Sequence, residues 1–173
     1  MDAQPRDDQP TPRRILVVAN ETAEGPILHD AIRFRAGGAR AVEVLVVAPA
    51  LNSRLRHWTS DEDEARRAAE LRLAACIERL AQAGVEATGL VGDAQPLQAI
   101  DDALGVFPAD EIVIATHPDG RSHWLSRGVV ARARSRFRQP ILHVVVDVER
   151  GREYLAGPGG AMLAYVGRAT DAA

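Results

Sequence analysis

The chain has 173 residues, of which 46% are hydrophobic and 26% are charged, and its formal net charge is -3. This length suits one domain with a sizeable core, and the composition is that of an ordinary globular protein. The negative charge argues against a general nucleic-acid binder. All 21 basic residues are arginine, so chemistry that needs a lysine amine is excluded.

The cysteine content and the N-terminal sequence bear on where the protein works. Cys76 is the single cysteine of the sequence and cannot form an intrachain disulfide, which favours a reducing compartment. The opening residues, MDAQPRDDQPTPRR, lack the apolar segment of a secretory signal, and apolar runs elsewhere are only strand-length. We therefore expect a cytoplasmic protein that does not span a membrane.

Apolar runs alternate with helical patterns along the chain. Strands are predicted at residues 15–19, 42–47, 85–91, 112–115 and 141–146. Helices are predicted to begin near residues 26 and 96 and to span residues 61–84 and 124–137. We expect a polar tail at residues 1–13, an α/β domain at 14–148, and a Gly-rich tail or dimer arm at 149–173.

This alternation predicts a doubly wound, five-stranded parallel α/β sheet with helices on both faces. In such a sheet, ligands bind at the carboxyl edge of the strands, so the loop after the strand at residues 112–115 is the expected site. Two phosphate sites are excluded, because there is no Gly-x-Gly-x-x-Gly after the first strand and no lysine for a P-loop. The Gly-x-Ser-x-Gly elbow of a serine hydrolase is also absent.

Five segments in order, ILVVANETAEG, VLVVAP, GDAQPLQAIDDA, ADEIVIATH and QPILHVVVD, resemble the universal stress protein family across residues 14–147. The resemblance implies a Rossmann-like fold of the adenine nucleotide alpha hydrolase type, with strand order 3-2-1-4-5. In ATP-binding members, the fourth strand leads into Gly-x2-Gly-x9-Gly-Ser/Thr, whose backbone amides hold phosphates at a helix N-terminus.

This chain keeps one of the four positions of that motif. Ala115 and Pro118 stand at the first two glycines, Gly128 is retained, and Val129 replaces the hydroxyl residue. Proline has no N–H to donate and fixes its own φ, and valine removes a hydroxyl from the phosphate shell. Asn20 replaces the family's acidic residue after the first strand. The resemblance therefore implies the family fold with an altered or lost ATP loop.

The loop still contains polar groups that suit an anion. Between residues 120 and 146 there are six arginines and no acidic residue. One interpretation is a solvated basic helix face, and a second is a phosphate or nucleotide site at the helix N-terminus. A third is a nucleic-acid surface, although few aromatic residues are present for stacking on bases. The candidate binding residues are Asn20, Thr116, His117, Arg121, Ser122, Arg127, Gly128 and Val129.

Other candidate residues have structural explanations. His117, Asp119 and His123 are residue types that ligate metals, but such a trio in a Pro/Gly loop is a weak signal. We predict no metal site and no catalytic residue. His143 is expected to be a satisfied histidine within a strand, and Cys76 to be part of a packed helix face.

Partners follow from the expected sheet order. The strand from Ile141 to Val146 would be the last one, and a bare apolar edge invites pairing in a homodimer. Alternatively, the segment from Met162 to Val166 covers that edge and leaves a monomer. No nucleic acid is expected as a partner, and the sequence names no protein partner.

Two functions remain open. The first is a non-catalytic universal stress protein-like module in stress response or signalling, without a resident cofactor. The second is a nucleotide- or phosphate-binding protein or a weak phosphohydrolase, with ATP or another nucleotide as ligand.

Overall fold

A computed structural model of the chain describes residues 12–19, 32, 42–50, 61–82, 84–118, 128–147, 150, 152–157 and 162–168. The strands are β1 (Arg13–Val18), β2 (Val42–Pro49), β3 (Ala87–Gly92), β4 (Glu111–Thr116), β5 (Ile141–Asp147), β6 (Arg152–Ala156) and β7 (Met162–Arg168). The helices are α2 (Asp61–Gln82), α3 (Pro96–Val106) and α5 (Val129–Arg136). None of these helices is both long and apolar enough to cross a membrane.

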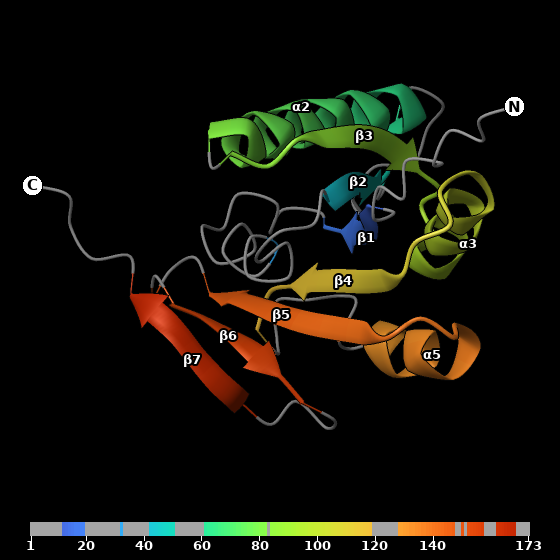
Figure 1. The fold of residues 1–173 in the computed structure, drawn as a ribbon. Coiled ribbons are helices and arrows are strands. Elements are labelled where there is room, and N and C mark those ends of the chain that lie inside the picture. Colours follow the sequence, from blue (N-terminus) through green and yellow to red (C-terminus); the bar gives the residue numbers. More distant parts are fainter. Residues whose placement is uncertain are drawn as a thin grey trace, which may run out of the picture.

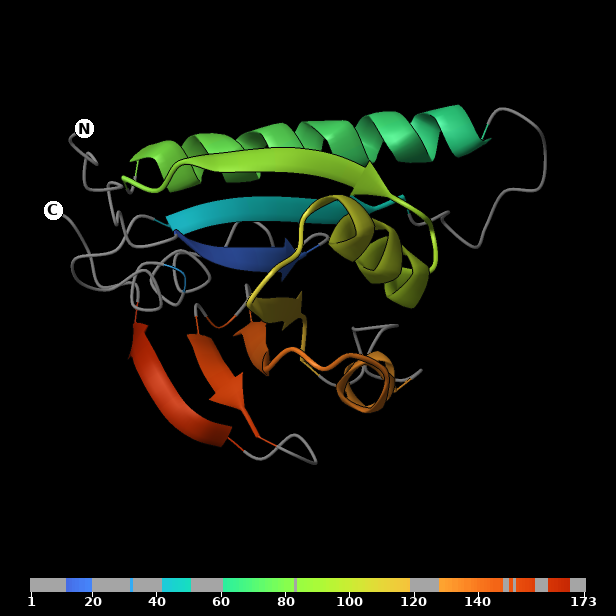
Figure 2. The same cartoon turned by 45° about the vertical axis from the view of Figure 1, so that its right-hand side comes forward.

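The strands form one sheet in the order β3-β2-β1-β4-β5-β6-β7 (Figures 1 and 2). The first five are parallel, so the predicted order 3-2-1-4-5 is confirmed. The chain order reverses between β1 and β4, which is where a doubly wound sheet offers a ligand crevice.

The apolar strand residues alternate between two cores, because successive side chains of a strand point to opposite faces. Ile15 and Val17 belong to the core beneath α2, together with the buried helical residue Ile32. Leu16 and Val18 belong to the core beneath α3 and α5. Helices therefore cover both faces, as predicted. The rest of the helix expected near residue 26 lies outside the described residues.

The C-terminal part of the chain differs from the sequence prediction. β6 pairs antiparallel with β5, from Val144↔Leu155 to Asp147↔Arg152, and β7 pairs antiparallel with β6. The prediction that the strand from Ile141 to Val146 ends the sheet is therefore wrong. The strand that covers the edge of β5 is β6. The segment from Met162 to Val166, which was the alternative candidate for this role, lies in β7, one strand farther out. The homodimer itself stays a prediction, and pairing through β5 would require β6 to move.

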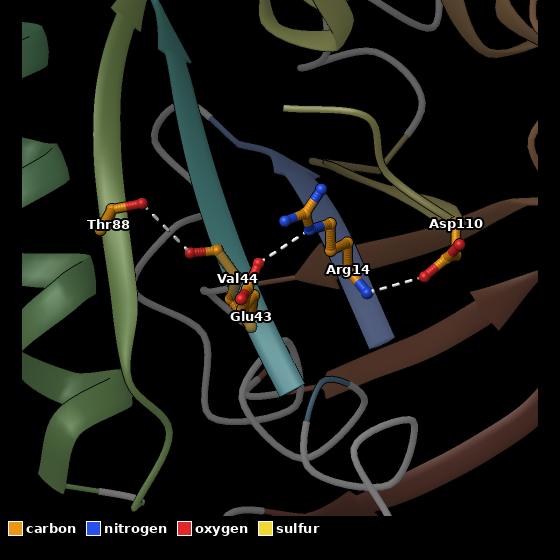
Figure 3. Close-up of polar contacts among 5 residues, drawn as sticks. All are labelled: Arg14, Glu43, Val44, Thr88 and Asp110. Atoms are coloured by element: carbon orange, nitrogen blue, oxygen red, sulfur yellow. Dashed lines mark hydrogen bonds and ion pairs between the residues drawn. The ribbon is translucent and has the colours of Figure 1, made fainter. Parts of the chain in front are cut away.

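Polar contacts join the strands at the amino edge of the sheet (Figure 3). The Arg14 side chain donates to Glu43 at 2.8 Å, and its backbone N–H donates to Asp110 at 2.9 Å. Thr88 Oγ1 donates to the carbonyl oxygen of Val44 at 3.5 Å. Beside them, the buried Glu111 forms a 2.6 Å ion pair with Arg13. Charge is thus compensated at this edge, away from the carboxyl ends of the parallel strands.

A glycine at the end of β3 sets how closely α3 approaches the sheet. A Cβ on Gly92 would lie 2.7 Å from the Cβ of Ala99 and 2.9 Å from Cγ1 of Val47. We expect Gly92→Ala to lower the free energy of unfolding by at least about 1 kcal/mol, because packed backbone and side chains must separate. Urea denaturation would measure this.

The control for this substitution lies in α3 itself. A Cβ on Gly105 would meet nothing within 4 Å. Because alanine is the better helix former, Gly105→Ala is expected to raise stability by about 0.5 to 1 kcal/mol. Equal effects of the two substitutions would contradict the close approach at Gly92.

Candidate functional site

The candidate site lies at the carboxyl end of β4, on the side where the parallel strands finish. β4 is buried along its whole length, and Thr116 is its last residue. Of the predicted binding residues, the structure describes Thr116, His117, Gly128 and Val129. Asn20, Arg121, Ser122 and Arg127 lie outside the described residues, so their positions stay predictions.

The hydroxyl of Thr116 is turned to a neighbouring strand. Thr116 is 2% exposed, and its Oγ1 shares a 2.8 Å hydrogen bond with Nε2 of His143, which is 3% exposed. Because β5 lies directly beside β4, the register brings these two residues together. The prediction that His143 is a satisfied histidine within a strand is confirmed. Its pairing with Thr116 was not predicted, since strand alternation places both on one face but names no partner.

His117 follows Thr116 and contacts the end of β5. Its Nδ1 lies 3.3 Å from the carbonyl oxygen of Val146. A carbonyl oxygen can only accept, so Nδ1 is the donor in this bond. A backbone carbonyl thus orients the first side chain beyond β4.

Gly128 and Val129 form the start of α5. Gly128 has φ 60 and ψ 32, in the left-handed region, and a Cβ there would meet nothing within 4 Å. Glycine is therefore favoured by its backbone conformation and not by crowding. Val129 is 2% exposed and packs in the core beneath α3 and α5. The first residue of α5 is thus a core side chain.

The first turn of α5 contains no acidic residue, and Gly128 supplies no side-chain cap. Backbone N–H groups at such a helix start favour anions. Two of the basic residues farther along have structural contacts: Arg136 forms a 2.7 Å ion pair with Asp101 of α3, and Arg134 donates to the Ala156 carbonyl of β6 at 3.5 Å. These contacts support the solvated, structural interpretation for this part of the basic run.

Two acidic residues at the same edge of the sheet are used in turns. Asp93 Oδ1 accepts the backbone N–H of Gln95 at 2.7 Å, just before α3 begins. Asp147, at the end of β5, accepts from the side chain of Arg150 at 3.2 Å. Within the described ranges, no three His, Cys, Asp or Glu side chains could together hold a metal ion. Asp119 and His123, named in the weak metal signal, lie outside those ranges.

Comparison with known proteins gives matches in structure only. No family model matches the chain, and no curated protein matches it. The chain is similar to the universal stress protein from Archaeoglobus fulgidus in complex with dAMP, at 21% identity and a TM-score of 0.50, with 76% of this chain and 96% of that one covered.

Two further solved structures show the same likeness. One is a universal stress protein family protein from Arabidopsis thaliana with AMP bound, at 12% identity and a TM-score of 0.50, covering 81% of this chain and 95% of that one. The other is a hypothetical protein used as a test case for structure-based assignment of function, at 16% identity and a TM-score of 0.60, covering 77% and 95%. Together with the strand order, these likenesses show that this chain has the universal stress protein fold.

Proposed function

We propose that this protein is a non-catalytic module of the universal stress type, acting in stress response or signalling in the cytoplasm, with its ATP-binding loop altered. One observation carries the proposal: the last hydroxyl of β4 and the first residue of α5 are both buried. Thr116 is hydrogen-bonded to His143, and Val129 packs in the core. This supports the proposal, because the Thr116 hydroxyl already has a partner in β5 and the apolar Val129 side chain offers no group to a phosphate.

Backbone chemistry supports the same conclusion. Pro118 stands where the nucleotide-binding motif has its second glycine, and it offers no N–H. Ala115, at the first glycine, is 1% exposed within β4. The module would act through its surface on a protein partner, without a resident cofactor.

A second candidate function is nucleotide or phosphate binding, including weak phosphohydrolase activity. Gly128 directly before α5 favours it, because this glycine of the family motif is kept and adopts a left-handed conformation that glycine tolerates. The AMP and dAMP bound by structurally similar proteins add to it. In this case Asn20, Arg121, Ser122 and Arg127 would supply polar groups around the phosphates beside Thr116, His117, Gly128 and Val129.

Nucleotide binding to the purified full-length chain decides between the two. We expect no stoichiometric nucleotide to be released on denaturation, as measured by mass spectrometry. We also expect no thermal shift with ATP, ADP, AMP or dAMP. A ligand at one hundred times its dissociation constant would stabilise the chain by about 2.7 kcal/mol, so real binding would be readily detected.

A concentration-dependent shift would contradict the first proposal and favour the second. Arg121→Ala and Arg127→Ala should then abolish the shift, because the anion would lose its charged donors. Arg132→Ala is the matched control, since Arg132 is an exposed arginine on α5 beyond the helix start.

A further inference from the structure

Helix α2 has a solvent-facing stripe in addition to the stripe that packs on the sheet. The packed stripe consists of Ala69, Leu73, Cys76 and Leu80, all buried. The outer stripe consists of Arg67, Leu71, Ala74, Glu78 and Ala81, all exposed. Leu71 is 74% exposed, which is high for a large apolar side chain. The outer stripe follows the four-three-four-three spacing of the seam between two packed helices.

We propose that the outer stripe is a self-association surface, on which α2 of a second copy of this chain packs antiparallel. The arrangement of charge carries the proposal. Arg67 lies four residues before Leu71, and Glu78 lies four residues after Ala74. A two-fold axis that passes between Arg72 and Leu73 therefore places Arg67 of each copy opposite Glu78 of the other. The same axis places Leu71 of each copy opposite Ala74 of the other.

Other pairings of the same helix are disfavoured by like charges. In a parallel pair in register, Arg67 would face Arg67 of the second copy, and Glu78 would face Glu78, so both pairs would repel. An antiparallel pair centred on Ala74 would set Glu70 against Glu78. In the favoured register Arg66 comes near Arg79, but Arg66 is already ion-paired with Glu70 at 3.4 Å in its own helix, and Arg79 also has a contact in its own chain. Charge complementarity thus favours the proposed register over these two alternatives.

The place of α2 in the fold suits such a contact. α2 runs along the outside of the molecule over β3 and β2, whereas the candidate site lies at the end of β4 (Figures 1 and 2). Association through α2 therefore does not depend on whether a nucleotide binds. A single pair of packed helices buries less surface than a standard-size interface, which buries at least about 1,200 Å² in total. We therefore expect a weak, reversible dimer.

Analytical ultracentrifugation of the full chain over a range of concentrations tests the surface. We expect a concentration-dependent dimer. Leu71→Asp should raise the dissociation constant at least about tenfold, because a carboxylate would replace the central apolar contact. The matched control is Val106→Asp on α3, since Val106 is 77% exposed and lies outside the stripe. This control should associate like the original chain.

Charge reversal tests the register. Arg67→Glu and Glu78→Arg should each raise the dissociation constant about tenfold, because two attractions become two repulsions. The double reversal should restore association, and the two single variants should associate with each other when mixed. The proposal is overturned if the original chain stays monomeric up to about 1 mM. It is equally overturned if the Leu71 and charge variants associate like the original chain, or if the double reversal is as weak as the singles.

Discussion

Replacing Ile114 by alanine is expected to lower the free energy of unfolding by about 2 to 5 kcal/mol. Ile114 is 0% exposed in β4, between Val18 of β1 and His143 of β5 in the register of the sheet. Its side chain belongs to the core beneath α3 and α5. Loss of its outer carbons would leave a cavity that strands held on both sides cannot close. Guanidinium denaturation of the purified chain would measure the loss.

Leu71→Ala is the matched control for Ile114→Ala. Leu71 is 74% exposed on the outer stripe of α2, so the free energy of unfolding should change by less than about 0.5 kcal/mol at concentrations where the chain is monomeric. If Ile114→Ala lowered the free energy of unfolding as little as Leu71→Ala, the placement of Ile114 in the core would be contradicted. The slope of the unfolding free energy against denaturant concentration should stay the same, since neither substitution changes the amount of surface exposed on unfolding.

The hydrogen bond between Thr116 and His143 should appear as a coupling free energy. Thr116→Val and His143→Leu are each expected to cost about 1 to 3 kcal/mol, because each leaves a buried polar atom without this bond. The double variant should cost less than the sum by at least about 0.5 kcal/mol. Denaturant unfolding of the four proteins in the cycle measures this.

His143 has a further contact within the chain, so the double variant is not expected to regain the original stability. Additive losses would show that Thr116 and His143 do not share a bond. The same variants bear on function when their thermal shift with ATP is measured. If the proposed loss of the nucleotide site is right, neither change should alter the response to ATP.

The central part of the fold could be predicted from local patterns. Apolar runs as long as a strand, separated by helical spacing and by turn residues, leave few arrangements once crossovers are right-handed. The parallel strands β1 to β5 follow this prediction, with some shifts at their ends. β3 begins at Ala87 and not at residue 85, and β2 extends to Pro49. Such ends depend on the pairing partner, which local sequence does not contain.

The pairing of the C-terminal hairpin was not predicted because its sequence signals are weak. REYLA is short, and the Gly-rich residues between it and MLAYVGR resemble a mobile tail. What makes them strands is the apolar edge of β5, which offers backbone groups to pair with. That edge exists only once the sheet is formed.

The sequence by itself determined the doubly wound sheet and the place of the loop after β4, because periodicity and chain order are local properties. The order of the parallel strands was implied by the resemblance to the universal stress protein family. Only the tertiary structure decided that β6 covers β5, that Thr116 pairs with His143 and that Val129 joins the core. Each of these contacts joins residues from different elements. Their geometry depends on how strands and helices pack, which no pattern within one element specifies.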